Sequence, residues 1–402
     1  MKKLSLIAAA ALVAASGALA ADAKGEAKLE ALLYGQYDKW NLNDEEKNAG
    51  KPEKSGILQG SFNVLYNTGE IANGASLNMG ARMNRKLAES HEGDWVTWAD
   101  GDPKVRGEQA ENDNTVFHTA NLTWTNGFAT IVAGRQYVEL EWLGDYHEAL
   151  VGVLTPHDFV TIVGGWTRAY ATADYDGYNA GFDNFHTANG VNGNGAGVLD
   201  ITIAPVEGLK IEPWFYHIPE VANWTGGKIA YENEFVGVSA AYTISKSDSK
   251  LAEEDDNFLH VTANVNPAEG LKIYAGLGKA GDKEGAPNLL SGVVGENITP
   301  FEDGALFLTN GVKTIYGGVG YEVGGLNLNL LYGVFDLSKG DNDEDGGKAS
   351  ELDFVAEYAM NKNFSARLAL VSRGRNDDAY AQNGAEKFTS GRLALIYNYG
   401  TK

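Results

Sequence analysis

Alternation of apolar and polar residues recurs along most of this chain and restricts its fold more than any other feature. From Ala75 to Asn84, apolar side chains at every second position alternate with polar or small ones. The same period of two returns at 116–124, 258–265, 271–278 and 364–371. A period of two is typical of a strand with one apolar and one polar face. Since no comparable stretch has the spacing of an amphipathic helix, we predict an all-β protein.

The alternating segments amount to about eighteen strands of roughly ten residues, the length of a strand that crosses a bilayer at a tilt. An even number keeps both ends of the chain on one side of a membrane. Omitting the pair 147–154 and 159–171 leaves sixteen strands, which is the alternative. The predicted spans are 31–41, 56–67, 74–86, 114–125, 128–138, 147–154, 159–171, 196–204, 209–218, 226–233, 235–244, 257–265, 271–279, 313–323, 326–336, 350–360, 364–373 and 387–399.

The connections between these strands alternate between short and long. Asn126-Gly127 is a two-residue hairpin signal, and Gly324-Gly325 is another tight link. The long connections, such as 87–113 and 280–312, are acidic and rich in glycine and asparagine. Transmembrane barrels have short periplasmic turns and long extracellular loops. The pattern therefore predicts an antiparallel up-and-down β-barrel.

The number of strands decides which face of the barrel is apolar. Sixteen or more strands enclose a lumen too wide for side chains to fill, so an apolar interior would leave a void. The apolar faces must then point outward to lipid, and the polar faces line a water-filled lumen. Aromatic residues near strand ends agree with interfacial girdles; they are Trp40, Trp124, Trp214, Tyr397 and Tyr399.

The amino terminus predicts export. Lys2 and Lys3 precede the apolar run Leu4–Val13, and Ala18-Leu19-Ala20 supplies a small-x-small cleavage site. We expect residues 1–20 to be a signal peptide and residues 21–402 to form the barrel. No later segment has 18 uninterrupted apolar residues, so we expect no membrane helix. These features together predict the bacterial outer membrane.

Composition excludes several classes of function. Acidic residues outnumber basic ones 54 to 32, giving a net charge of -22, so nucleic acid is not an expected partner. The chain has no cysteine, which removes disulfides, thiolate metal sites and cysteine nucleophiles. The seven histidines are scattered, and no phosphate loop, zinc signature or dinucleotide fingerprint is present. We predict no enzyme, no catalytic residues and no cofactor.

Several short motifs resemble a known family. They are Gly134-Arg135-Gln136, the run from Glu141 to Ala149, and Gly208-Leu209-Lys210 leading into Trp214-Phe215-Tyr216. These segments resemble the Opr-family outer-membrane porins, which include the major porins of the epsilonproteobacteria, with OprD-type channels as more distant relatives. The resemblance implies a homotrimer, a third loop folded into the lumen and passive diffusion of small solutes. Such a barrel would contact outer-membrane lipid and lipopolysaccharide.

Charged residues at inward positions suggest a constriction. Arg82, Arg367 and Arg392 fall on the polar faces of the third, seventeenth and eighteenth predicted strands, which closure of the barrel brings to one stretch of wall. Acids follow the fifth strand, and if that segment folds inward they face this basic wall across water. Charge and diameter set selectivity in such pores. The alternative for each residue is a solvated lumen position away from the constriction. The candidates are Arg82, Arg135, Glu139, Glu141, Asp145, Glu148, Arg367 and Arg392.

One acidic run imitates a calcium loop. Asp341, Asp343 and Asp345 have the spacing of the first ligands of an EF-hand, but the twelfth position is Leu352 in place of glutamate. The run is therefore not an EF-hand. A weakly bound Ca²⁺ at these three aspartates stays open as an alternative to a solvated run of charge.

These observations predict an outer-membrane porin through which small hydrophilic solutes and ions diffuse, with a mild preference for cations because acids predominate. The alternatives are a substrate-preferring channel or a hydrophobic-solute transporter. A barrel enzyme or an adhesin has less support in the sequence.

Overall fold

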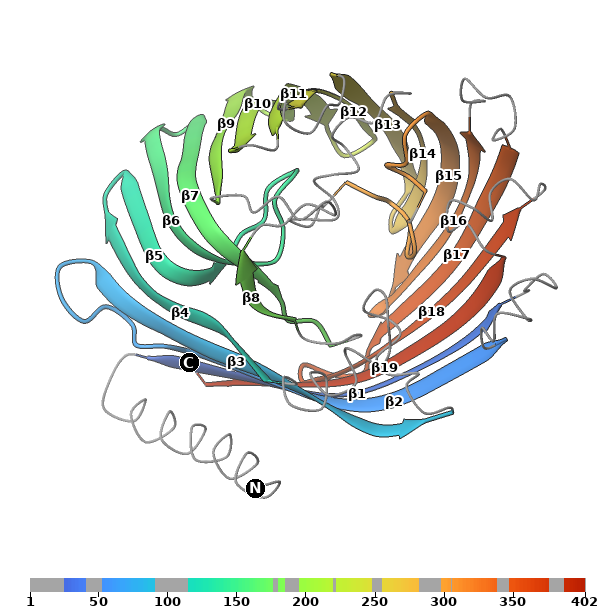
Figure 1. Cartoon of the computed structure of the whole chain (residues 1–402), viewed down its shortest axis with the longest axis horizontal. Coiled ribbons are helices and arrows are strands. Elements are labelled where there is room, and N and C mark those ends of the chain that lie inside the picture. Colours follow the sequence, from blue (N-terminus) through green and yellow to red (C-terminus); the bar gives the residue numbers. More distant parts are fainter. Residues whose placement is uncertain are drawn as a thin grey trace.

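The described part of the chain is a closed antiparallel β-barrel (Figure 1). The computed structural model describes residues 25–40, 53–90, 115–175, 180–184, 195–219, 222–247, 255–281, 298–304, 306–337, 347–375 and 387–401. The predicted signal peptide lies outside these ranges. Within them no helix is long and apolar enough to cross a membrane.

Eighteen of the nineteen described strands form the wall, and the short strand β8 pairs only with β7. The prediction of an all-β barrel with eighteen strands is confirmed. The strands are β1 Glu26–Trp40, β2 Lys54–Asn67, β3 Ala75–Glu89, β4 Thr115–Asn126, β5 Ala129–Tyr137, β6 Tyr146–His157, β7 Val160–Thr172, β8 Ala180–Asn184, β9 Ala196–Val206, β10 Leu209–Ile218, β11 Ala222–Glu232, β12 Val236–Ser247, β13 Asp256–Ala268, β14 Leu271–Ala280, β15 Val312–Val323, β16 Leu326–Leu337, β17 Gly347–Ala359, β18 Phe364–Arg375 and β19 Phe388–Thr401.

The barrel closes where the first strand meets the last. Strand β1 pairs with β2 on one side and with β19 on the other, so Gln36 lies opposite both Ile57 and Arg392. Figure 1 shows β1 lying between β2 and β19. Closure leaves no unpaired edge in this wall, as a barrel in lipid requires, because an open edge would expose backbone polar groups to hydrocarbon.

The sixteen-strand alternative is wrong, because β6 and β7 are full wall strands of 12 and 13 residues. The alternation in β6 is weak because both of its faces carry apolar side chains. Leu150 and Leu154 are exposed, whereas Val151 is buried and Val153 packs against a hydrophobic cluster. An apolar patch inside the barrel therefore obscured the period of two.

The outward faces of the strands are apolar, as expected for contact with lipid. Leu77 and Met79 of β3 and Leu393 and Leu395 of β19 are between 42% and 47% exposed. Inward-facing Gln59 of β2, by contrast, is fully buried. The short turns gather at one end of the barrel; Gly127, between β4 and β5, adopts a φ of 55° that suits glycine.

Candidate functional site

The segment 138–145, between β5 and β6, lies inside the barrel. It turns back on itself through a hydrogen bond from the Leu140 N–H to the Leu143 carbonyl oxygen, at 2.9 Å. Trp142 at its tip is 1% exposed and meets the ring of Phe258 on β13 edge to face, with centroids 5.8 Å apart. This segment therefore crosses the lumen from β5 towards the wall on the far side.

A second segment, comprising residues 298–304 and 306–311 between β14 and β15 and termed the 298–311 segment, also lies inside (Figure 1). Phe301 packs against Phe335 of β16, with ring centroids 5.0 Å apart, and Phe307 packs edge to face against Phe258 at 5.6 Å. The two inner segments thus share one aromatic cluster. Gly333 of β16 leaves space for this cluster, because a Cβ at that position would lie only 2.3 Å from the Phe301 ring.

The shared cluster narrows the lumen from one side. Its largest buried members come from β10 to β16 and from the two inner segments, and an arrangement of such size excludes water from that part of the barrel. The open passage must therefore run beside the remaining wall, which carries the predicted arginines. The buried members include Trp142, Leu143, Trp214, Tyr216, Trp224, Phe258, Phe301, Leu306, Phe307, Tyr316 and Phe335.

The 298–311 segment is tied to the basic wall by its own acids. The Glu302 carboxylate lies 2.5 Å from Nη2 of Arg367 and 4.0 Å from Nη1 of Arg392. Asp303 lies 2.6 Å from Nη1 of Arg373, an arginine of β18 that the sequence analysis did not single out. Pairs of this kind, partly shielded from water, are stronger than pairs on an open surface.

The same two residues are also held through their backbone. The Glu302 N–H donates to Oδ2 of Asp353 at 3.0 Å, and the Asp303 N–H donates to Oε1 of Glu351 at 2.9 Å. Both acceptors are 1% exposed and lie on β17. Wall carboxylates therefore bind the backbone of the segment while wall arginines bind its side chains.

The acids that follow β5 do not meet Arg367 or Arg392. Oε2 of Glu141 lies 2.9 Å from Nζ of Lys228 on β11. Glu139 is exposed, and Asp145 is partly buried, which raises the pKa of its carboxyl to about 6. The acids facing the basic wall are thus on a different inner segment from the one expected.

Three further candidates lie on the wall. Arg82 is buried, with Nη2 2.7 Å from Oε1 of Glu30 and Nη1 donating to Oγ of Ser61 at 2.8 Å. The carboxylate of Glu148 lies 3.8 Å from Nε of Arg135. It lies 2.7 Å from Nη2 of Arg168, so Glu148 belongs to an ion cluster of strands β5 to β7.

A third stretch of chain, just after β7, reaches the wall formed by β1 to β3. The amide of Asn84 donates to the Asp174 carbonyl oxygen at 2.7 Å, and Gln59 donates to the Tyr175 carbonyl oxygen. The Tyr175 ring meets Tyr34 edge to face at 5.9 Å. Sequence reasoning missed this contact, although an aromatic residue in an acidic, glycine-rich connection was a signal for it.

No metal site is evident in the part of the chain that the structure describes: it holds no group of three His, Asp or Glu side chains arranged to bind an ion. The aspartates 341, 343 and 345 lie outside the described residues.

Comparison with known families agrees with this geometry. The model of the family described as Gram-negative porin matches residues 8–379. The chain belongs to the Gram-negative porin family. This porin is therefore an outer-membrane channel protein, and its family and fold are those of non-enzymatic channels.

Solved structures share the fold of this porin at low sequence identity. OccAB4 of Acinetobacter baumannii is 15% identical with a TM-score of 0.70, covering 94% of this chain and 98% of that one. OccK9 of Pseudomonas aeruginosa is 13% identical with a TM-score of 0.74 and the same coverage. OpdK of Pseudomonas aeruginosa is 12% identical with a TM-score of 0.71, covering 94% and 99%. No curated protein sequence gives a significant match.

Proposed function

We propose that this porin is a constricted diffusion channel for small hydrophilic solutes, and that its constriction gives it a preference among them. The observation that carries this proposal is the pair of inner segments packed on one aromatic cluster. They leave a passage beside a wall of polar and charged side chains, including Arg82, Arg367 and Arg392. One structural neighbour, OpdK of Pseudomonas aeruginosa, has also been solved with vanillate.

We further propose a modest preference for cations. Arg82, Arg367 and Arg373 each lie within 2.7 Å of a carboxylate oxygen, so their charge is largely compensated. The chain as a whole carries a net charge of -22. Acids in a vestibule raise the local concentration of cations, and salt weakens the effect.

Single-channel recording in planar bilayers tests the channel function. We expect stepwise, ohmic openings and, across a potassium chloride gradient at low salt, a zero-current potential of the sign that favours potassium. A potential favouring chloride would overturn the cation preference. Ester or peptide hydrolysis without conductance would overturn the channel itself and favour a barrel enzyme.

Assembly and processing are part of the same proposal. We propose a homotrimer in contact with outer-membrane lipid and lipopolysaccharide, a signal peptide at residues 1–20, and kinship with the major porins of the epsilonproteobacteria. The motifs around Arg135 and Trp214 support the kinship. Native mass spectrometry in mild detergent should give the mass of a trimer lacking those 20 residues in each chain, and a monomer at every concentration would reject the trimer.

A further inference from the structure

A polar cavity lies beside the 298–311 segment, and the Glu302–Arg367 ion pair forms part of its lining. It has a volume of about 560 Å³, within the range of small-molecule sites. Strands β13 to β18 supply its wall, and Pro300 and Glu302 lie at its border. Gly270 and Glu322, which adjoin the short turns after β13 and β15, place the cavity at the short-turn end of the barrel.

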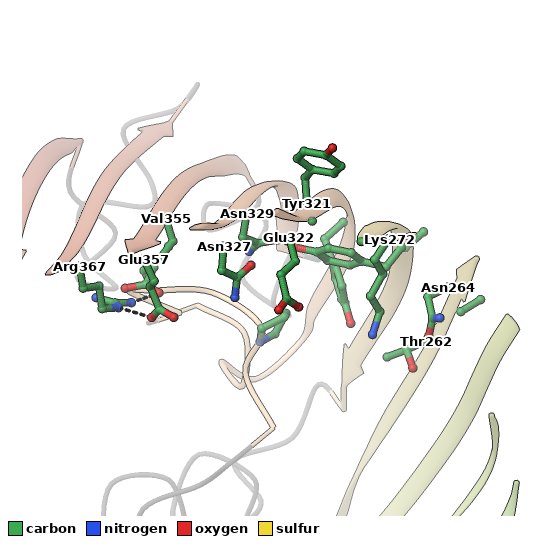
Figure 2. A pocket seen from close by; sticks show the side chains of 18 residues that line it. Thr262, Asn264, Lys272, Tyr321, Glu322, Asn327, Asn329, Val355, Glu357 and Arg367 are labelled. Carbon is green, nitrogen blue, oxygen red and sulfur yellow. Dashed lines mark hydrogen bonds and ion pairs between the residues drawn. The ribbon is translucent and has the colours of Figure 1, made fainter. Parts of the chain in front are cut away.

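Several polar groups of the cavity have no partner within the described residues. Figure 2 shows Lys272, Glu322 and Asn327 pointing into the same space. In that part of the chain, neither the Lys272 ammonium nor the Glu322 carboxylate makes an ion pair, although they stand on neighbouring strands. Lys272, Glu322 and Asn327 are exposed, so their donors and acceptors are open to a polar ligand.

The charges around the cavity alternate in sign. The positive charge of Arg367 is already compensated by Glu302 at 2.5 Å and by Glu357 at 3.2 Å. Lys272 and Glu322 add one charge of each sign to the wall. Any strongly charged solute would meet like charge on part of this surface, which costs free energy. The cavity therefore does not favour a strongly anionic or cationic solute.

The remaining polar groups suit hydroxyls. Asn264, Asn327 and Asn329 line the cavity, and an amide side chain both donates and accepts hydrogen bonds, as a hydroxyl does. Lys272 adds donors and Glu322 adds acceptors. Neighbouring hydroxyls on a neutral solute can satisfy Lys272, Glu322 and Asn327 together.

Gly320 of β15 keeps the cavity open. A Cβ built there would meet the Leu328 carbonyl oxygen and the Lys272 Cβ at 3.8 Å, which is ordinary contact. A larger side chain at this position would therefore be tolerated by the backbone and would occupy the cavity. At Gly318, by contrast, a Cβ would lie 2.3 Å from the Tyr274 ring.

We propose that this cavity binds a neutral polyhydroxylated solute of the size of a mono- or disaccharide. Lys272 and Asn327 donate to its hydroxyl oxygens, and Glu322 accepts from its hydroxyl groups. This inference rests on the proposed channel function, since the solute reaches the cavity through the lumen.

The test is interruption of the single-channel current by maltose added on the short-turn side. We expect maltose to produce brief blocks whose frequency rises with concentration. Replacing Gly320→Val should weaken the apparent affinity about tenfold, equivalent to about 1.4 kcal/mol, while the open-channel current persists. The matched control is Gly317→Val, on the opposite face of the same strand with similar free space, and it should leave the blocks unchanged.

The outcomes separate the two proposals. Absence of any conductance would reject the channel function, whereas normal conductance without maltose block would reject only the cavity. Block that persists unchanged in Gly320→Val would place the sugar elsewhere and overturn the assignment. Block by benzoate or arginine but not by maltose would overturn the neutral class of ligand. Retained heat-modifiable migration on gels shows that each variant is folded.

Discussion

The Glu302 carboxylate, on a segment inside the barrel, lies 2.5 Å from the Arg367 guanidinium on β18. This ion pair joins the 298–311 segment to β18. Strand β18 is next to β19, which closes the barrel by pairing with β1. The ion pair also means that the channel supplies its own counter-ion to the arginines of the wall. A solute anion would have to compete with Glu302 for Arg367.

Neutralising that carboxylate should therefore reduce the preference for cations. In Glu302→Gln, Arg392 loses its nearby carboxylate and Arg367 keeps only Glu357, at 3.2 Å, so the wall attracts anions to the passage more strongly. We expect the zero-current potential across a potassium chloride gradient to shift towards chloride.

The control for this variant is Glu148→Gln, which removes a carboxylate from the separate cluster with Arg135 and Arg168. It should leave the potential nearly unchanged. If neutralising Glu139, Glu141 and Asp145 together alters selectivity while Glu302→Gln does not, the 138–145 segment forms the selective constriction instead.

Removing the anchor of the 138–145 segment should widen the passage. Trp142 is almost fully buried against Phe258, and replacing a buried tryptophan with alanine typically costs about 3–5 kcal/mol. We expect Trp142→Ala to increase single-channel conductance and its fluctuations. Trp166→Ala is the matched control, because Trp166 is 43% exposed on the wall. Equal conductance in the two variants would mean that Trp142 does not hold the segment in place.

The same segment should respond to pH through Asp145. Burial raises the pKa of this carboxyl from 3.8 to about 6, so the packed segment favours its protonated form. The stabilisation is complete below pH 3.8 and is lost as pH rises through about 6. We expect current fluctuations to increase between pH 4 and pH 7.

Asp145→Asn should abolish this dependence. Asparagine accepts the φ of 71° found at this position and carries no charge to titrate. Two results would contradict this role of Asp145. One is current fluctuations that do not depend on pH in the unmodified channel, and the other is an equal pH dependence in Asp145→Asn.

A charge on the lipid face should destabilise the barrel more than the same charge in the lumen. Leu330 of β16 is 47% exposed on the outer face, and arginine near the bilayer midplane costs about 2–4 kcal/mol. Asn327→Arg, on the inner face of the same strand, should cost much less. Urea unfolding in lipid vesicles measures the free energy of unfolding of Leu330→Arg and Asn327→Arg. An equal decrease in the two variants would contradict the assigned faces.

The ends of the barrel can be assigned by labelling intact cells. Short turns face the periplasm in outer-membrane barrels. A tag inserted beside Gly346, in the connection between β16 and β17, should be reachable from outside, and one at Asn126 should not. Labelling in the opposite sense would invert the orientation.

Local sequence was sufficient for the wall of this barrel. A strand between two others presents each side chain to lipid or to the lumen, so alternation such as that of Ala75–Asn84 specifies both the strand and its faces. The number of strands then followed from counting. Strand β6 was ambiguous, because Val151 and Val153 face an apolar cluster where a polar lumen was expected.

The interior depended on contacts between distant parts of the chain. Phe301 and Trp142 lie in connections without periodicity, and nothing near them in the sequence indicates that they share a cluster with Phe258. Likewise, alternation placed Arg367 on an inward face, but only the tertiary structure shows that its partner is Glu302 and not one of the acids that follow β5. Periodicity reports the environment of each residue along a strand, whereas the partner of a charge inside a wide lumen is set by which loop fills that space.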